Sequence, residues 1–329
     1  ERVGHVRRAG HGDNIYLDLG NDAWEAVEIA PDGWRVVADP SVRFRRPGGL
    51  RPLPAPVAGG SVDELRLFIN VASETDWRLI VGWLVETPNP DGPYPLLNLT
   101  GGSGAAKTTA CRVLRSLVDP NVSPLQSLPH SIENLMIDAT DNAIVGYDNL
   151  SYIQPWLSDA LCRLATGGGF ATRELYTNTG RVIFEVMRPV ILNGIGEVVL
   201  REDLLDRSII AGLLDIPDDK RRDEKEFWAA FGAVHARVLG AILDAASTAL
   251  RRLPETTLER KPRMADFALW ATAASPTRWW RIGSASAGSP SGSGGGPRSS
   301  PPPWTTSAPS SKKNPGSTPW PVGTTCWRV

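Results

Sequence analysis

The sequence predicts an α/β fold, a parallel sheet flanked by helices, with a small β unit before it and a helical part after it. Between residues 95 and 214 short apolar runs alternate with helical patterns, an order that favours a parallel sheet covered by helices. Residues 13–46 alternate apolar and polar side chains around a Pro31-Asp32-Gly33 turn, as small antiparallel units do. Residues 223–253 place apolar side chains along one stripe of a long helix.

Composition divides the chain into a foldable part and a tail. Residues 277–329 contain 8 Gly, 9 Pro and 11 Ser but no Leu, Asp or Glu, so they cannot build a core and are expected to be disordered. Five Trp in this segment suggest a reading-frame change, and a genuine Ser/Pro-rich arm is the alternative. Residues 1–276 carry 29 basic and 36 acidic residues, a net charge of −7. This excludes a protein that coats nucleic acid by bulk charge.

Cysteine spacing and hydropathy bear on the compartment. The three cysteines stand far apart with no CxxC pair, which supports neither a zinc ribbon nor a disulfide framework. We find no run of 18 apolar residues, so no membrane span is expected. A cytoplasmic protein is the simplest interpretation. Because the chain starts at Glu1 rather than Met, we expect its N-terminal unit to be incomplete.

The sequence divides into four predicted parts, each with its own helices and strands. Residues 1–60 form the β unit and a Pro/Gly-rich linker over 47–60, residues 61–222 form the α/β domain with its N-terminal helices, residues 223–276 form a helical module expected to be truncated, and residues 277–329 are the tail. Ser61 and Glu64 form a capping box that starts a helix. The patterns further predict helices over 76–86, 107–118, 155–166, 223–253 and 264–274, and strands over 96–100, 143–147, 182–186, 189–193 and 209–214.

A glycine-rich segment between the first predicted buried strand and the helix that follows predicts a phosphate-binding loop. It comprises Gly101, Gly102, Ser103, Gly104, Ala105, Ala106, Lys107, Thr108 and Thr109. Backbone N–H groups and the helix N-terminus bind phosphate in this context, a Lys reaches the β/γ oxygens and a Thr holds Mg²⁺. Ala106 replaces the last Gly of G-x-x-x-x-G-K-[ST], and we expect its methyl group to fit helical φ/ψ. A surface turn with an exposed Lys is the alternative.

A second strand supplies an acid for the metal. Asp148 follows the apolar run 143–147, about 40 residues after the loop, and the carboxyl ends of parallel strands lie at one edge of the sheet. Asp148 is therefore the candidate metal ligand together with Thr108, and an ordinary strand-end turn is the alternative. Asn149 stands where a proton-accepting acid would follow, and an amide cannot take a proton from water. ATP binding is thus better supported than hydrolysis.

Three further segments complete a family pattern: Leu161-Cys-Arg-Leu-Ala-Thr-Gly-Gly-Gly-Phe-Ala-Thr-Arg-Glu-Leu-Tyr176, Arg188-Pro-Val-Ile-Leu-Asn193 and Asp203-Leu-Leu-Asp-Arg207-Ser-Ile-Ile. With the loop and Asp148, they make residues 96–216 resemble the P-loop ATPases of the superfamily 3 helicase type within the AAA+ class. The helicase half of phage and plasmid primase-helicases is the most similar group. The resemblance implies a P-loop NTPase, AAA+-like domain that uses ATP and Mg²⁺.

The resemblance also implies residue roles. Lys107, Asp148, Asn149, Asn193 and Arg207 would form the catalytic set, with Asn193 sensing the γ-phosphate and Arg207 acting as an arginine finger in a neighbouring subunit. A basic loop in the pore of a ring, expected to be a hexamer, would contact single-stranded DNA through Arg173 and Phe170, with Arg163, Arg181 and Tyr176 as further candidates. The alternatives are a helix C-cap at 166–169, a turn role for Asn193, a hairpin-core role for the two aromatic residues, and pairing of Arg207 with Asp203 or Asp206.

These observations predict an ATP-binding and ATP-hydrolysing enzyme, a DNA helicase motor of phage or mobile-element replication. A non-motor regulatory ATPase or nucleotide switch is one alternative. An inactive remnant, given Asn149 and the unusual tail, is the other.

Overall fold

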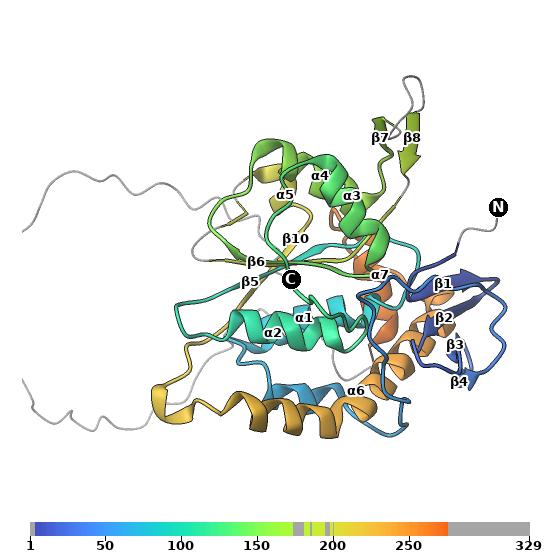
Figure 1. The fold of residues 1–329 in the computed structure, drawn as a ribbon. Helices are drawn as coiled ribbons and strands as arrows, with labels where there is room; N and C mark the ends of the chain where they lie inside the picture. Colours follow the sequence, from blue (N-terminus) through green and yellow to red (C-terminus); the bar gives the residue numbers. More distant parts are fainter. Residues whose placement is uncertain (1–3, 174–180, 185, 195–197, 200, 276–329) are drawn as a thin grey trace, which may run out of the picture. The chain divides into compact units, whose positions relative to one another are not determined.

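A parallel sheet with the strand order β10-β5-β9-β6 lies at the centre of the fold (Figure 1). Its strands are β5 (Leu96–Thr100), β6 (Val145–Leu150), β9 (Val190–Gly194) and β10 (Ser208–Gly212). The computed structural model describes residues 4–173, 181–184, 186–194, 198–199 and 201–275. After β5 the chain first forms β6 on one side of it, and then β9, which pairs with both β5 and β6. It finally forms β10 on the other side of β5. The direction therefore reverses at β5, and ligands of such sheets bind beside the carboxyl ends of the strands at that point.

Helices cover both faces of this sheet. On one face lie α1 (Glu74–Glu86) and α2 (Lys107–Ser116), and on the other lie α3 (Ile132–Asp141), α4 (Pro155–Thr166) and the short α5 (Glu202–Leu205) (Figure 1). The apolar sides of α3 and α4 form one buried cluster with β6 and β9. Helix α4 begins at Pro155, whose fixed φ suits a first helical position, and ends at Gly167 with φ +79°. The layered α/β fold agrees with the prediction.

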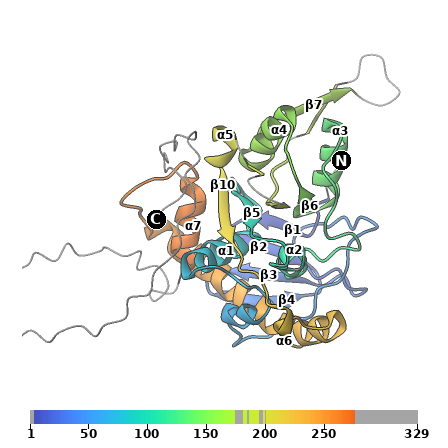
Figure 2. The same cartoon turned by 90° about the vertical axis from the view of Figure 1, so that its left-hand side faces the viewer.

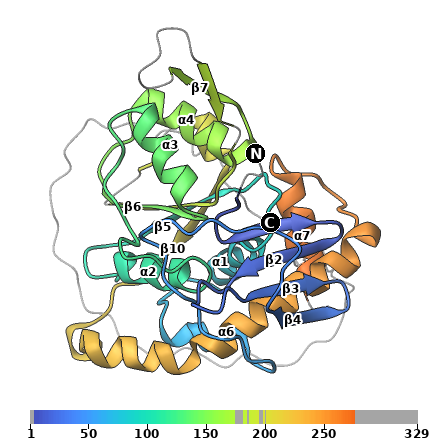
Figure 3. The same cartoon turned by 45° about the vertical axis from the view of Figure 1, so that its right-hand side comes forward.

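A separate antiparallel sheet precedes this domain in the chain. Its order is β1 (Arg8–His11), β2 (Asn14–Asp18), β3 (Ala26–Ala30) and β4 (Gly33–Val37). The long helix α6 (Glu224–Arg252) contacts β3 and β4 (Figure 3). Trp34 Nε1 donates to Asp244 Oδ1 at 2.8 Å, and Ser247 Oγ donates to the Ala30 carbonyl at 2.6 Å. The predicted β unit is therefore present, and it begins with a strand earlier than the alternating pattern indicated.

The C-terminal helices pack on the first helix of the α/β domain. Helix α7 (Ala265–Ala274) lies beside α1 and α6 (Figure 2), and Trp270 Nε1 donates to the Val85 carbonyl at 3.3 Å. By length and composition α6 could also cross a membrane, but that evidence is weak, because core helices of soluble proteins pass the same test. Its buried side chains include Phe231, Val238 and Ile242.

Most predicted elements are found within a few residues of their expected bounds, and the differences are local. The capping box at Ser61 is present, but it starts η1 (Val62–Leu67), a 3-10 helix rather than an α-helix. Helix α3 was not predicted. Strands β7 (Phe170–Arg173) and β8 (Arg181–Phe184) form a hairpin, of which only the second strand was expected. The predicted tail, 277–329, lies outside the described residues.

Candidate functional site

The predicted phosphate loop connects the carboxyl end of β5 to the first turn of α2. Residues 101–106 form this connection, and Gly102, Ser103 and Gly104 are exposed to solvent. The site therefore lies at the carboxyl edge of the sheet beside β5, where the chain direction reverses. Helix α2 points its amino end at the loop and adds a partial positive charge.

Lys107 folds back over the loop. Its Nζ donates to the Gly101 carbonyl at 2.9 Å and to the Gly102 carbonyl at 2.7 Å. These are neutral acceptors, so the ammonium keeps its charge available beside the loop. An anion that reached the loop would meet this charge together with the amino end of α2.

Ala106 departs from the sequence-based expectation. We expected helical φ/ψ, but Ala106 has φ +55° and ψ +35°, the left-handed conformation. In this region the Cβ of an L-residue crowds the following carbonyl, which costs roughly 1–2 kcal/mol. The methyl group does not fit as predicted, and the missing glycine of the motif leaves backbone strain directly before Lys107.

The structure brings Thr108 and Asp148, the two predicted metal ligands, together. Thr108 Oγ1 donates to Asp148 Oδ1 at 3.0 Å, although the two residues are 40 positions apart. Asp148 lies within β6, where the pairing with β9 shifts register between Tyr147 and Leu150. This irregularity includes Asn149 at φ +57°. One carboxylate and one hydroxyl suit Mg²⁺, which takes one or two carboxylates and completes its shell with water and phosphate oxygens. The described residues contain no cluster of three or more His, Cys, Asp or Glu side chains that could hold a metal alone.

Asn193 lies between the loop helix and Asn149. Strand β9 separates β5 from β6, so the end of β9 brings this amide next to both. Asn193 Oδ1 accepts from the Asn149 backbone N–H at 3.3 Å, and Asn193 Nδ2 donates to Cys111 Sγ at 3.2 Å. Burial raises the pKa of the Cys111 thiol to about 12, so Cys111 is a neutral partner rather than a nucleophile. Cys111 was not among the predicted site residues, although it follows Thr108 by three positions and so shares its side of α2.

Arg207 lies at the opposite edge of the sheet. Ser208 pairs with Leu96 at the start of the two strands, so Arg207 precedes the amino end of β10, and a five-residue strand spans about 16 Å. Arg207 Nη1 donates to the Asp203 backbone carbonyl at 2.6 Å, not to a carboxylate. Its Nε is buried and has no hydrogen-bond partner among the described residues. Arg207 therefore belongs to a different edge of the sheet from its own chain's phosphate loop.

The predicted DNA-contacting residues fall largely outside the described part. The backbones of Phe170 and Arg173 belong to β7 and pair with β8, but their side chains and that of Arg181 lie outside the described residues, as does Tyr176. Arg163 is exposed in the last turn of α4. These assignments stay predictions.

A comparison with known proteins identifies the family of this chain. Residues 62–280 match the model of the actinomycete integrative conjugative element replication protein family. No curated protein matches the chain. Among solved structures, one A form apo structure of the NrS-1 C terminal region has a TM-score of 0.43 at 12% identity and covers 66% of this chain. Another A form structure, of residues 305–718, has a TM-score of 0.41 at 12% identity and covers 60% of this chain. This chain spans 64% and 48% of those two chains.

Proposed function

We propose that this chain, which belongs to the actinomycete integrative conjugative element replication protein family, is the ATP-hydrolysing motor of mobile-element DNA replication. The observation that carries the proposal is the Thr108–Asp148 contact of 3.0 Å beside Lys107. A hydroxyl, a carboxylate and a lysine at one edge of a parallel sheet are the side chains that phosphate transfer from a nucleoside triphosphate requires. Membership of a replication protein family supports DNA as the polymer on which the enzyme acts in the cytoplasm.

Each residue then has a role in the proposed reaction. The amides of residues 101–106 and the Lys107 ammonium bind the phosphates of ATP. Thr108 and Asp148 would hold Mg²⁺, which would supply positive charge against the phosphate oxygens. Asn193, hydrogen-bonded to Asn149 and Cys111, has its amide fixed at the junction of β9 and β6, where it would sense the γ-phosphate.

Asn149 supports a second candidate, a nucleotide-controlled switch that binds ATP and hydrolyses it slowly or not at all. The Asn149 side chain stands directly after the metal acid and cannot accept a proton from water. A motor and a switch share the binding site, and turnover separates them.

Binding and turnover by the full chain test both candidates. Lys107→Ala should abolish binding of a fluorescent ATP analogue, while Lys261→Ala, an exposed lysine on another segment, should leave it unchanged. Asp148→Ala should retain binding but lose Mg²⁺-dependent hydrolysis, with Asp13→Ala as the exposed control. Stimulation of hydrolysis by single-stranded DNA that falls with added salt supports the motor, and binding without turnover supports the switch. Unchanged ATP affinity in Lys107→Ala would exclude both.

The position of Arg207 supports catalysis between subunits. A finger on the edge away from its own loop could act only on a neighbouring chain, as in a hexameric ring. Arg207→Ala should then leave ATP binding intact and reduce turnover by roughly 10³ or more. Mixing Arg207→Ala with Lys107→Ala subunits should restore part of the activity, because one kind of interface combines an intact loop with an intact Arg207. Normal turnover by Arg207→Ala, or specific activity that does not change with protein concentration, contradicts this arrangement.

A further inference from the structure

A segment that follows β10 runs beside the phosphate loop, with one backbone hydrogen bond to the end of β5 and one to the loop itself. The Leu213 N–H donates to the Thr100 carbonyl at 2.8 Å, and the Ile216 N–H donates to the Gly104 carbonyl at 3.3 Å. The chain then forms the short helix η2 (Asp218–Lys220) and continues through Arg221. Residues 213–221 therefore form one wall of the loop.

Two side chains of this wall lie against the loop backbone because the loop has glycines there. A Cβ on Gly102 would come within 2.5 Å of Asp215 Oδ1, and a Cβ on Gly104 would lie 3.3 Å from Arg221 Nη2. Gly104 also has φ +95°, which L side chains rarely adopt. The Arg221 guanidinium thus lies close to the loop backbone at Gly104.

Arg221 forms an exposed ion pair with Asp218. Arg221 Nη2 lies 2.9 Å from Asp218 Oδ1, and the two side chains are 59% and 89% exposed. An ion pair this exposed contributes little free energy, so exchanging Asp218 for another anion costs little. A guanidinium forms two parallel charge-assisted hydrogen bonds with a phosphate group.

Side chains of both charge signs lie around the loop. The Asp215 carboxylate faces Gly102 and would repel a phosphate, whereas Lys107 binds the carbonyls of Gly101 and Gly102 and would attract it. At Gly104 the side chain nearest to the loop is the guanidinium. An anion on that part of the loop would therefore meet a positive charge.

We propose that Arg221 is a second cationic nucleotide-binding residue, which leaves Asp218 and contacts the polyphosphate tail of a nucleoside triphosphate bound in the loop. This inference rests on the proposed function and assigns one more residue to the same site. It also gives Asp218 a role, since Asp218 competes with the nucleotide for the guanidinium.

Three variants of the full chain test the proposal with a fluorescent ATP analogue. Arg221→Ala should weaken binding roughly tenfold to a hundredfold, the value of hydrogen bonds to charged groups, and Arg221→Lys should recover part of the loss. Arg222→Ala, which removes the same charge from the exposed neighbouring residue, should have little effect. Asp218→Asn should bind as tightly as the unaltered protein or more tightly, because it frees Arg221.

The outcomes distinguish this inference from the proposed function. If Lys107→Ala loses binding while Arg221→Ala binds normally, Arg221 has no nucleotide contact and the phosphate-loop assignment stands. Equal losses in Arg221→Ala and Arg222→Ala would mean that only general charge matters, which also overturns the inference. If the unaltered chain does not bind the analogue, both proposals are wrong.

Discussion

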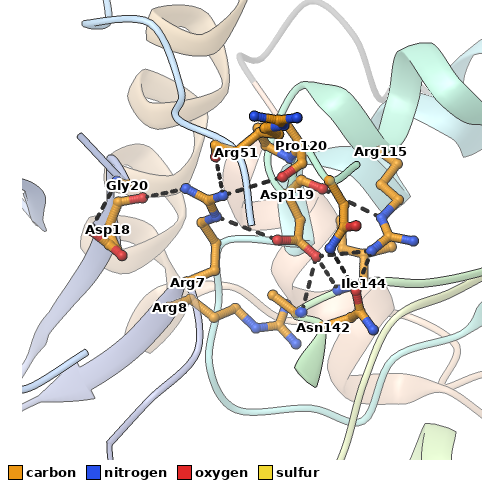
Figure 4. Close-up of polar contacts among 12 residues, drawn as sticks. Arg7, Arg8, Asp18, Gly20, Arg51, Arg115, Asp119, Pro120, Asn142 and Ile144 are labelled. Atoms are coloured by element: carbon orange, nitrogen blue, oxygen red, sulfur yellow. Dashed lines mark hydrogen bonds and ion pairs between the residues drawn. The ribbon is translucent and has the colours of Figure 1, made fainter. Parts of the chain in front are cut away.

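The two ends of helix α2 both carry charged side chains, and they differ in burial. Just beyond the carboxyl end, Asp119 lies between Arg7 and Arg115 (Figure 4), and all three side chains are at most 2% exposed. At the amino end, Thr108 is exposed and Lys107 is half-buried. The same helix thus connects a closed polar cluster to an open one.

The hydrogen-bond and ion-pair partners of these side chains explain the difference in burial between the two ends of α2. Asp119 accepts hydrogen bonds from the backbone N–H groups of Ala143 and Ile144 at 3.0 Å each, just before β6, and forms ion pairs with both arginines. Burial lowers the pKa of Arg7 and Arg115, and the Asp119 charge opposes that shift. At the amino end, by contrast, Lys107 binds only backbone carbonyls, which a ligand can replace. At the carboxyl end every charged group has a buried partner, which indicates a structural role. At the amino end a ligand can replace the partners of Lys107, which indicates ligand binding.

The largest expected effect is on the free energy of unfolding, which substitutions at the two ends of α2 should change by different amounts. Asp119→Ala leaves two buried arginines without their carboxylate, so it should lower the free energy of unfolding by about 3–5 kcal/mol. Asp148→Ala removes an acid at the open end and should change that free energy by less than about 1 kcal/mol. Urea denaturation of both variants measures the difference. Similar losses in the two variants would mean that the open end is structural as well.

The second expected effect is a pH dependence of stability, which comes from the buried acid Glu86. Burial raises the pKa of Glu86, at the end of α1, well above its usual range, with the nearby Arg8 charge opposing the shift, and its Oε2 has no hydrogen-bond partner among the described residues. A raised folded-state pKa means that the folded chain holds the proton longer than the unfolded chain. The free energy of unfolding should therefore fall as pH rises above the ordinary Glu value.

Denaturation at several pH values between about 5 and 8 measures this dependence. Glu86→Gln should flatten the slope, because an amide mimics the protonated acid and does not titrate. Glu74→Gln, at the exposed start of the same helix, should leave the slope in place. An unchanged slope in Glu86→Gln would assign the pH dependence to other groups.

Local patterns predicted the strand and helix around the open end, but not the contacts of the closed end. The buried run of β5, the glycines and Lys107 are adjacent in the sequence, so one short segment was sufficient to predict strand, loop and helix. The Arg7–Asp119 contact joins residues 112 positions apart, and no local pattern indicates it. The same is true of Arg221, which reaches the loop only through the fold.

Helix α3 shows a different reason for a missed element. Ile132 and Ile137 are exposed, so apolar residues do not mark one clean stripe. The available signal was the cap, since the Ser131 side chain accepts from the Asn134 N–H, as an N-cap serine does. Ala106 was misjudged for a related reason, because whether a residue before a helix is helical or left-handed depends on the turn that the whole loop makes.

The smallest expected effect tests whether the open end stores strain that the closed end lacks. Ala106→Gly relieves a left-handed conformation that costs roughly 1–2 kcal/mol but adds roughly 0.5–1 kcal/mol of unfolded-state entropy, so the free energy of unfolding should stay constant or rise by up to about 1.5 kcal/mol. Ala105→Gly carries the same entropic cost without any relief, because Ala105 has no positive φ. It also loses a methyl group that is 1% exposed, so it should destabilise the protein by about 1 kcal/mol or more.

The two alanine variants differ by one position and have the same composition, so their difference combines the left-handed backbone at residue 106 with the buried methyl group of Ala105. Urea denaturation measures it directly, and affinity for the fluorescent ATP analogue shows whether the strain matters for binding. A loop that no longer carries strain and lacks the Ala106 methyl group should bind phosphate several-fold more tightly, on the order of 1 kcal/mol. If Ala106→Gly destabilises the protein as much as Ala105→Gly, the left-handed alanine costs nothing, and the open end of α2 is as relaxed as the closed one.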